Sequence, residues 1–208
     1  MNRFRFCALT PLLLAMGLLI QSCAFAPVTP PDYYVLPSPE GTPTNRVALD
    51  GVRVSVGPLS LPGYLQKSSI ALRDAHSNQV YVTDKAVWGE PLEDGITRVL
   101  CATLSQALAP VGGVAVPLRS NLDTTLRVYL VITKFDGDLG SSVTLDTDWG
   151  LTTPRGRILR MGHFVQHADA GPTLDTLIAA QGQLLEALGK QISQAIRQLN
   201  PDGALERH

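Results

Sequence analysis

Apolar residues recur along this chain with two periods, one typical of strands and one typical of helices. Alternation at every second position predicts strands at 52–56, 126–135 and 143–151. Shorter or less regular apolar runs predict further strands at 33–36, 70–72, 80–82, 114–116 and 158–165. Turn residues at Asp136-Gly137 and Pro154-Arg155-Gly156 predict that the strands at 126–135, 143–151 and 158–165 form an antiparallel meander.

Two longer segments show the helical period of 3.6 residues. The first runs from Pro91 to the residue before Pro110, with proline at its first turn and the acidic Glu93 and Asp94 beside it, as the helix dipole favours. The second, Thr173–Leu199, has an apolar stripe wide enough to pack against a sheet, and its polar face is not basic. We expect the second helix to cover its own sheet.

The N-terminus has the order of a bacterial lipoprotein signal. Arg3 and Arg5 precede an apolar run, Phe6–Ile20, and Ser22 stands directly before Cys23. We expect residues 1–22 to be removed and the Cys23 thiol to be acylated, with residues 23–32 as a proline-rich tether. The alternatives are an ordinary cleaved signal and a membrane-spanning helix. The run is shorter than the roughly 20 apolar residues that a span requires.

Acylation of Cys23 would anchor the protein in a membrane. Each methylene buried in the bilayer contributes about 0.8 kcal/mol to the free energy of membrane binding. A single acyl chain therefore anchors a protein only marginally, whereas several chains such as palmitate anchor it durably. Ala24 follows the cysteine, in place of the aspartate that retains enterobacterial lipoproteins in the inner membrane. We therefore expect the periplasmic face of the outer membrane.

Composition narrows the classes of function. Without residues 1–22 the chain has 186 residues, 15 basic and 18 acidic, and the resulting charge of −3 argues against nucleic acid as a partner. Cys101 would be the one thiol left beside Cys23, and its place in an apolar helical pattern predicts a buried, inert side chain.

The chain contains no common motif for catalysis or for binding a nucleotide or metal. G-x-S-x-G, G-x-x-x-x-G-K-[ST], G-x-G-x-x-G and H-E-x-x-H do not occur. His163 and His167 fall on a predicted strand and its exit rather than on one helix face, which disfavours a zinc site. Asp146 and Asp148 are best interpreted as the solvated face of a strand. We expect no catalytic residue, no metal and no cofactor.

Three short motifs occur in order behind the cysteine: Tyr33-Tyr34-Val35-Leu36, Leu61-Pro62-Gly63-Tyr64-Leu65 and Trp88-Gly89-Glu90-Pro91-Leu92. Together they resemble the ABC-type transport auxiliary lipoproteins, and the similarity extends over roughly residues 33–199. Tyr64 and Leu65, in an irregular apolar loop, suggest either a docking surface or core packing. Trp88 is better interpreted as core packing at the start of a helix.

The resemblance implies a fold and a role. The fold would be a single-domain α/β sandwich over residues 33–200, with a mixed, mostly antiparallel sheet and two long helices, followed by a flexible C-terminus at 201–208. The role would be that of a non-enzymatic adaptor in the transport of phospholipids or other hydrophobic molecules between membranes. Its partners would be a protein with mammalian-cell-entry (MCE) domains and, in many systems, an ABC permease and ATPase. Gly63 stands where relatives often carry an acidic residue.

Two other functions remain open at this stage. A structural lipoprotein of another envelope complex would show the same sequence features. A periplasmic hydrolase would have to use His163, His167, Asp146 and Asp148. A homo-oligomer is expected if the partner is a symmetric ring, because several weak contacts then act together.

Overall fold

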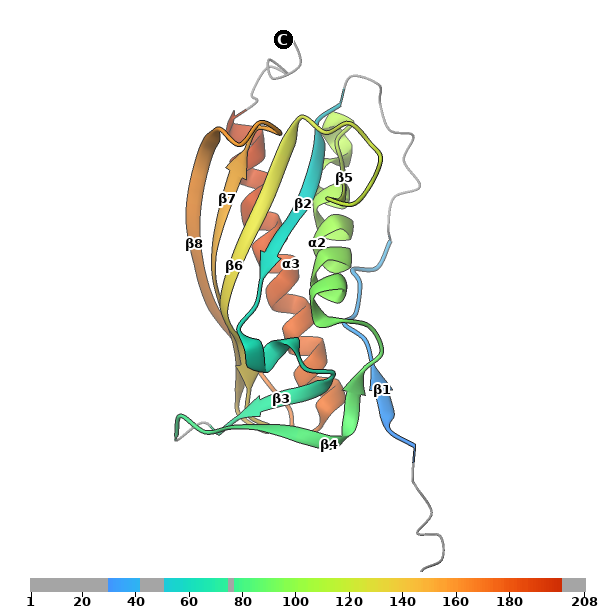
Figure 1. The fold of residues 1–208 in the computed structure, drawn as a ribbon, viewed down its shortest axis with the longest axis vertical. Helices are drawn as coiled ribbons and strands as arrows, with labels where there is room; N and C mark the ends of the chain where they lie inside the picture. The colour runs from blue at the N-terminus through green and yellow to red at the C-terminus, as the bar shows by residue number, and fades with distance from the viewer. Residues whose placement is uncertain (1–29, 42–50, 75–76, 200–208) are drawn as a thin grey trace, which may run out of the picture. The chain divides into compact units, whose positions relative to one another are not determined.

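The computed structural model describes residues 30–41, 51–74 and 77–199, and in these ranges it contains two β-sheets and two long helices (Figure 1). Cys23 and residues 1–22 lie outside the described ranges, as do residues 201–208 and most of the predicted tether. The fold described below is that of the unit that begins at Pro31.

The larger sheet has five strands in the order β5-β2-β6-β7-β8. Its strands are β2 (Arg53–Ser60), β5 (Val114–Pro117), β6 (Leu126–Gly137), β7 (Ser142–Thr152) and β8 (Ile158–Asp169). β2 runs parallel to both β5 and β6, whereas β6, β7 and β8 are antiparallel neighbours. The predicted meander is confirmed.

The smaller sheet has three strands in the order β1-β4-β3. These are β1 (Asp32–Tyr34), β3 (Ser69–Arg73) and β4 (Val80–Trp88); β1 is parallel to β4, and β3 is antiparallel to it. A short 3₁₀ helix, η1 (Gly63–Gln66), connects β2 to β3, and a second, η2 (Ala109–Val111), precedes β5. The mixed, mostly antiparallel α/β fold is confirmed, but the sequence pattern did not show that the strands divide between two sheets.

Both predicted helices are present, as α2 (Leu92–Leu108) and α3 (Leu174–Leu199). They contact each other; α2 also packs on β2, and α3 packs on β7 and β8 (Figure 1). The strand residues predicted to share the inner face are buried, for example Leu130 on β6 and Leu145 on β7, while Val131 on the opposite face is exposed. No helix in the described ranges meets the length and hydropathy needed to cross a bilayer.

Two glycines allow α3 to lie close to its neighbours. A Cβ at Gly182 would lie 2.5 Å from Pro37 Cγ, and one at Gly189 would lie 2.7 Å from Thr103 Cγ2 on α2. Glycine lowers helix propensity by about 1 kcal/mol relative to alanine. At these two positions it permits close packing that a larger residue would prevent.

Candidate functional site

The three motifs, far apart in the sequence, are neighbours in the fold. Tyr34 on β1 is in register with Trp88 on β4, and the Gly89 N–H donates a hydrogen bond of 2.7 Å to the Tyr34 carbonyl. The Trp88 N–H donates to the carbonyl of Ser68, directly after η1, over 2.7 Å. The first motif and the segment that follows the second motif therefore flank the third.

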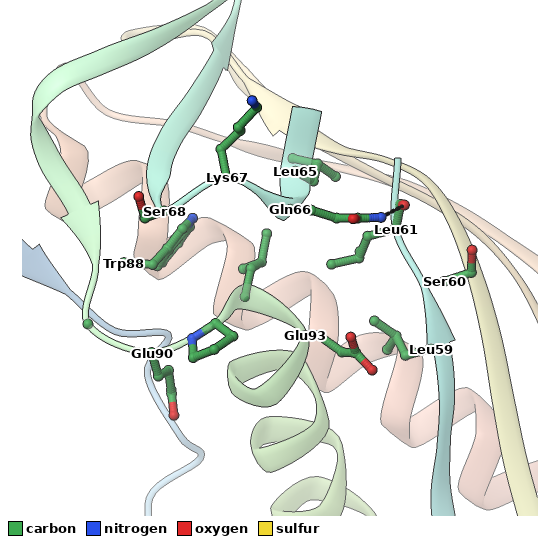
Figure 2. Close-up of a pocket in the computed structure, with 13 residues that line it drawn as sticks. Leu59, Ser60, Leu61, Leu65, Gln66, Lys67, Ser68, Trp88, Glu90 and Glu93 are labelled. Atoms are coloured by element: carbon green, nitrogen blue, oxygen red, sulfur yellow. Dashed lines mark hydrogen bonds between the residues drawn. The ribbon is translucent and has the colours of Figure 1, made fainter. Parts of the chain in front are cut away.

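A cavity of about 590 Å³ lies where these segments meet, between the end of β2, η1, the end of β4 and the start of α2 (Figure 2). Its volume falls in the range of about 300–1,000 Å³ that is typical of ligand-binding clefts. The residues that line it are Leu59, Ser60, Leu61, Leu65, Gln66, Lys67, Ser68, Trp88, Gly89, Glu90, Pro91, Leu92 and Glu93.

The lining of the cavity combines buried apolar side chains with exposed polar ones. The five large apolar side chains of the lining are each at most 8% exposed; they are Leu59, Leu61, Leu65, Trp88 and Leu92. Lys67 and Glu93 are exposed and come from different sides of the cavity, one after η1 and one from the first turn of α2 (Figure 2). The Gln66 amide donates to the Leu61 carbonyl over 2.7 Å and closes the η1 loop.

A buried ionic cluster fixes η1 behind the cavity. Asp136 on β6 is 2% exposed and accepts hydrogen bonds from Arg73 Nε (2.6 Å) and Arg73 Nη2 (3.0 Å), as well as from the Tyr64 hydroxyl. The Arg73 guanidinium carbon also lies 5.7 Å from the centre of the Tyr64 ring. The cluster joins η1 and the smaller sheet to the larger one.

The ionisation of this cluster follows from its packing. Burial, together with the hydrogen bond to Asp136 and the charge of that residue, raises the pKa of Tyr64 to about 12. The hydrogen bond to Asp136 raises the pKa of Arg73 above its usual value. At neutral pH the phenol is therefore a neutral donor and the guanidinium is a cation.

A second ion pair connects the third motif to α2, and its arginine also bonds to the first motif. Arg98 Nη2 lies 2.5 Å from Glu90 Oε1 and also donates to the Leu36 carbonyl over 2.9 Å. Glu90, on the cavity rim, is thereby occupied by a partner from α2. The segment after β1 is held against the helix that forms the floor of the site.

The residues singled out from the sequence occupy distinct places here. Tyr64 is half-buried with its hydroxyl in the ionic cluster, Leu65 is 3% exposed and lines the cavity, and Trp88 is 7% exposed, as core packing predicts. A Cβ at Gly63 would meet nothing within 4 Å, so a larger residue fits there.

Asp136 requires a correction. The sequence predicts a turn at Asp136-Gly137, but β6 continues through both residues and the turn follows at 138–141. Arg73 and Tyr64 compensate the charge of the buried Asp136 carboxylate. Because both residues are distant from Asp136 in the sequence, no local pattern predicted that Asp136 would be buried. Arg73, Lys67 and Glu93 were also missed, because isolated charged residues form no pattern.

The remaining titratable candidates do not converge on the cavity. His163 Nδ1 lies 2.9 Å from Asp148 Oδ1, and His163 Nε2 lies 3.7 Å from Asp146 Oδ1, on the exposed face of β7 and β8. His167 instead contacts the Thr144 hydroxyl, 2.8 Å away. Across the described ranges, no three His, Cys, Asp or Glu side chains are grouped to hold a metal ion. Burial raises the pKa of Cys101 to about 12, so its thiol is protonated and inert, as predicted.

Together these features define an α/β sandwich domain with a half-open cavity, lined by both apolar and polar residues, between the ends of strands from its two sheets. Residues 34–193 match the family of the ABC-type transport auxiliary lipoprotein component, and the chain belongs to this family. The resemblance inferred from the three motifs is confirmed.

Solved structures show the same fold. The crystal structure of an uncharacterized protein has a TM-score of 0.66 at 19% sequence identity, with 81% of this chain and 99% of that chain covered. Protein XCC0632 from Xanthomonas campestris has a TM-score of 0.62 at 12% identity, with 83% of this chain and 98% of that chain covered. No curated protein matches the chain by sequence.

Proposed function

We propose that this protein is an outer-membrane lipoprotein that serves as a non-enzymatic adaptor in the transport of phospholipids or other hydrophobic molecules between membranes. Its partner is a protein with MCE domains, and an ABC permease and ATPase supply the energy. Membership of the ABC-type transport auxiliary lipoprotein family supports a role beside a transporter. Cys23, acylated, is the anchor, and Ala24 favours the outer membrane.

One observation carries the adaptor role: residues of the second and third motifs line the same cavity, and the first motif is bonded to the third. Residues of the second and third motifs form its apolar walls, and the first motif braces the third through Tyr34 and Leu36. An adaptor requires a preformed surface whose shape does not depend on the partner. The Asp136 cluster and the Arg98–Glu90 pair provide that rigidity from behind.

The chemistry of the lining supports binding rather than catalysis. Its ionisable side chains are Lys67, Glu90 and Glu93, and Glu90 is engaged by Arg98. No histidine or cysteine is among the residues that line this cavity, so a nucleophile paired with an imidazole base does not arise there. The hydrolase alternative would have to use the exposed face around His163 instead.

The anchor and the domain are close in sequence. Eight residues separate Cys23 from the start of β1 at Asp32, and the nine Cα–Cα steps between them span at most about 32 Å when fully extended. The domain would therefore stay near the membrane surface, within reach of a partner that crosses the periplasm. Several copies around a symmetric partner would strengthen binding through multivalency, so we also propose a homo-oligomer.

The test is co-purification of the full chain from its own cells. A C-terminally tagged copy is isolated from detergent-solubilised membranes, and the proteins that accompany it are identified and quantified by mass spectrometry. The adaptor role predicts a protein with MCE domains at near-stoichiometric yield. Recovery of a different envelope complex instead would contradict it and favour the structural-lipoprotein alternative. Native mass measurement of the same sample reports the number of copies.

A further inference from the structure

The cavity lies beside the end of β2, beyond the point where the pairing of β2 with β5 ends. β2 pairs with β5 over Arg53–Val56, whereas its pairing with β6 continues as far as Ser60. β5 ends at Pro117, and the next N–H, that of Leu118, donates to the Val56 carbonyl. Leu59 and Ser60 therefore have β6 on one side and line the cavity on the other (Figure 2).

From this arrangement the geometry points to a binding site for an extended polypeptide segment, which would lie beside Leu59 and Ser60 and extend the row of β5. This inference rests on the proposed adaptor function and specifies the kind of partner segment that the cavity takes. A strand added to a sheet gains main-chain hydrogen bonds for affinity, and its alternate side chains enter pockets that give specificity.

The walls determine which side chains fit. A segment along β2 would direct every second residue towards Leu65, Trp88 and Leu92, which are buried apolar residues. These inward positions require apolar side chains. An acyl chain would match the apolar walls, but it would cover backbone groups of the strand end without giving them hydrogen-bond partners, which is unfavourable.

The rim supplies complementary charges. Lys67 and Glu93 are exposed on opposite sides of the cavity, and neither has an ion-pair or hydrogen-bond partner among the described residues (Figure 2). A segment with an acidic residue towards Lys67 and a basic residue towards Glu93 would pair both. The site therefore favours a short apolar strand with opposite charges at its two ends.

The test starts from an unbiased set of probes. A phage library of random seven-residue peptides is selected on the purified full chain in detergent and counter-selected on the Lys67→Glu/Glu93→Lys double variant. We expect enriched peptides with apolar residues at alternate positions, an acidic residue near one end and a basic residue near the other. Failure to enrich any peptide that discriminates between the two proteins overturns the inference.

Matched variants then locate the binding of the best peptide by fluorescence anisotropy. Lys67→Glu or Glu93→Lys should each weaken binding about threefold, the scale of an exposed ion pair, and the double variant should prefer a peptide with its charges exchanged. Ser68→Trp, from an exposed position at the mouth, should block the cavity and abolish binding. The controls Arg155→Glu and Ser120→Trp, both at exposed positions outside the lining, should leave affinity unchanged.

Two further outcomes separate this inference from the adaptor function. A fluorescent dodecanoate probe tests the lipid alternative. If this probe binds to the wild type but not to Ser68→Trp, and no peptide binds, the cavity is a lipid site and the inference is wrong. If the Ser68→Trp variant still co-purifies with an MCE-domain protein, the adaptor function stands and the partner binds elsewhere. If the peptides bind as expected but no MCE-domain protein co-purifies, the site stands and the adaptor function fails.

Discussion

The hydroxyl of Tyr64 donates a hydrogen bond to the carboxylate of Asp136, a residue 72 positions later in the chain and 2% exposed. This contact joins η1 to the larger sheet, and Arg73 reinforces it from the smaller sheet. The loop that carries the second motif is thus held in place by a charge that no local pattern indicates. The stability of the fold around η1 should depend on the Asp136 carboxylate remaining paired with Arg73 and Tyr64.

Removal of Arg73 should destabilise the fold more than removal of the Tyr64 hydroxyl. Arg73→Met leaves Asp136 buried without its cation, and we expect a loss of about 3 kcal/mol in the free energy of unfolding. Tyr64→Phe removes one hydrogen bond to a charged acceptor, for a loss of about 1.5 kcal/mol. Urea denaturation of the full chain measures both. Arg155→Met, at an exposed position, is the control and should be neutral; equal losses at Arg73 and Arg155 would refute the account.

Stability should fall in strongly alkaline solution in a way that depends on Tyr64. Its pKa is raised from 10.0 to about 12 in the folded protein, so the unfolded chain loses this proton at lower pH. The stability contributed by the neutral phenol is complete below pH 10.0 and is lost as the pH rises towards about 12. Unfolding free energies measured across this window should fall less steeply for Tyr64→Phe than for the wild type. Parallel curves would show that Tyr64 does not titrate as described.

Gly162→Ala should destabilise the sheet because of Trp149. Trp149 is in register with Gly162, and a Cβ at position 162 would lie 2.4 Å from Cζ2 of the buried indole. Overpacking of this kind costs about 1–3 kcal/mol. Thermal unfolding followed by circular dichroism gives the change in melting temperature. Gly63→Ala, where a Cβ meets nothing within 4 Å, should change little, and a similar loss at both sites would contradict the packing argument.

Cys23→Ala should release the protein from the membrane. Without the thiol no acyl chain can be attached, and the described part of the chain has no helix able to span a bilayer. Fractionation of the envelope should find the variant in the soluble periplasmic fraction and the wild type in the membrane fraction, with the outer membrane separated by density. Retention of the variant in the membrane would rule out this anchor. Cys101→Ala, a change at a buried free thiol, is the matched control.

The elements that the sequence predicted well are those whose signal is local and periodic. α2 and α3 each start one residue after the predicted position, because a 3.6-residue stripe and a proline at the first turn are visible within a single segment. The face shared by Val143, Leu145 and Trp149 is buried as expected, since alternation within one strand determines which side chains share a face.

Only a few residues of the site, and not their arrangement, were predictable from the sequence. Tyr64, Leu65 and Trp88 were identified from motifs, and Leu65 and Trp88 do line one cavity. Asp136 and Arg73 were missed, because Asp136-Gly137 was predicted to be a turn and an isolated arginine forms no pattern. The burial of Asp136 is compensated by Arg73 and Tyr64, which lie 63 and 72 positions away in the chain.

The sequence by itself determined the two long helices, the meander, the inert Cys101 and the family, because each leaves a signal in the order of side chains along the chain. It predicted only residues 80–82 of the longer strand β4 (Val80–Trp88). The tertiary structure alone decided that β2 lies between β5 and β6, that the strands divide into two sheets and that a cavity opens past the end of β5. Parallel pairing and the burial of a paired charge depend on contacts between segments distant in the chain. Neither parallel strand pairing nor a buried ion pair produces a periodic pattern of residues that a sequence would show.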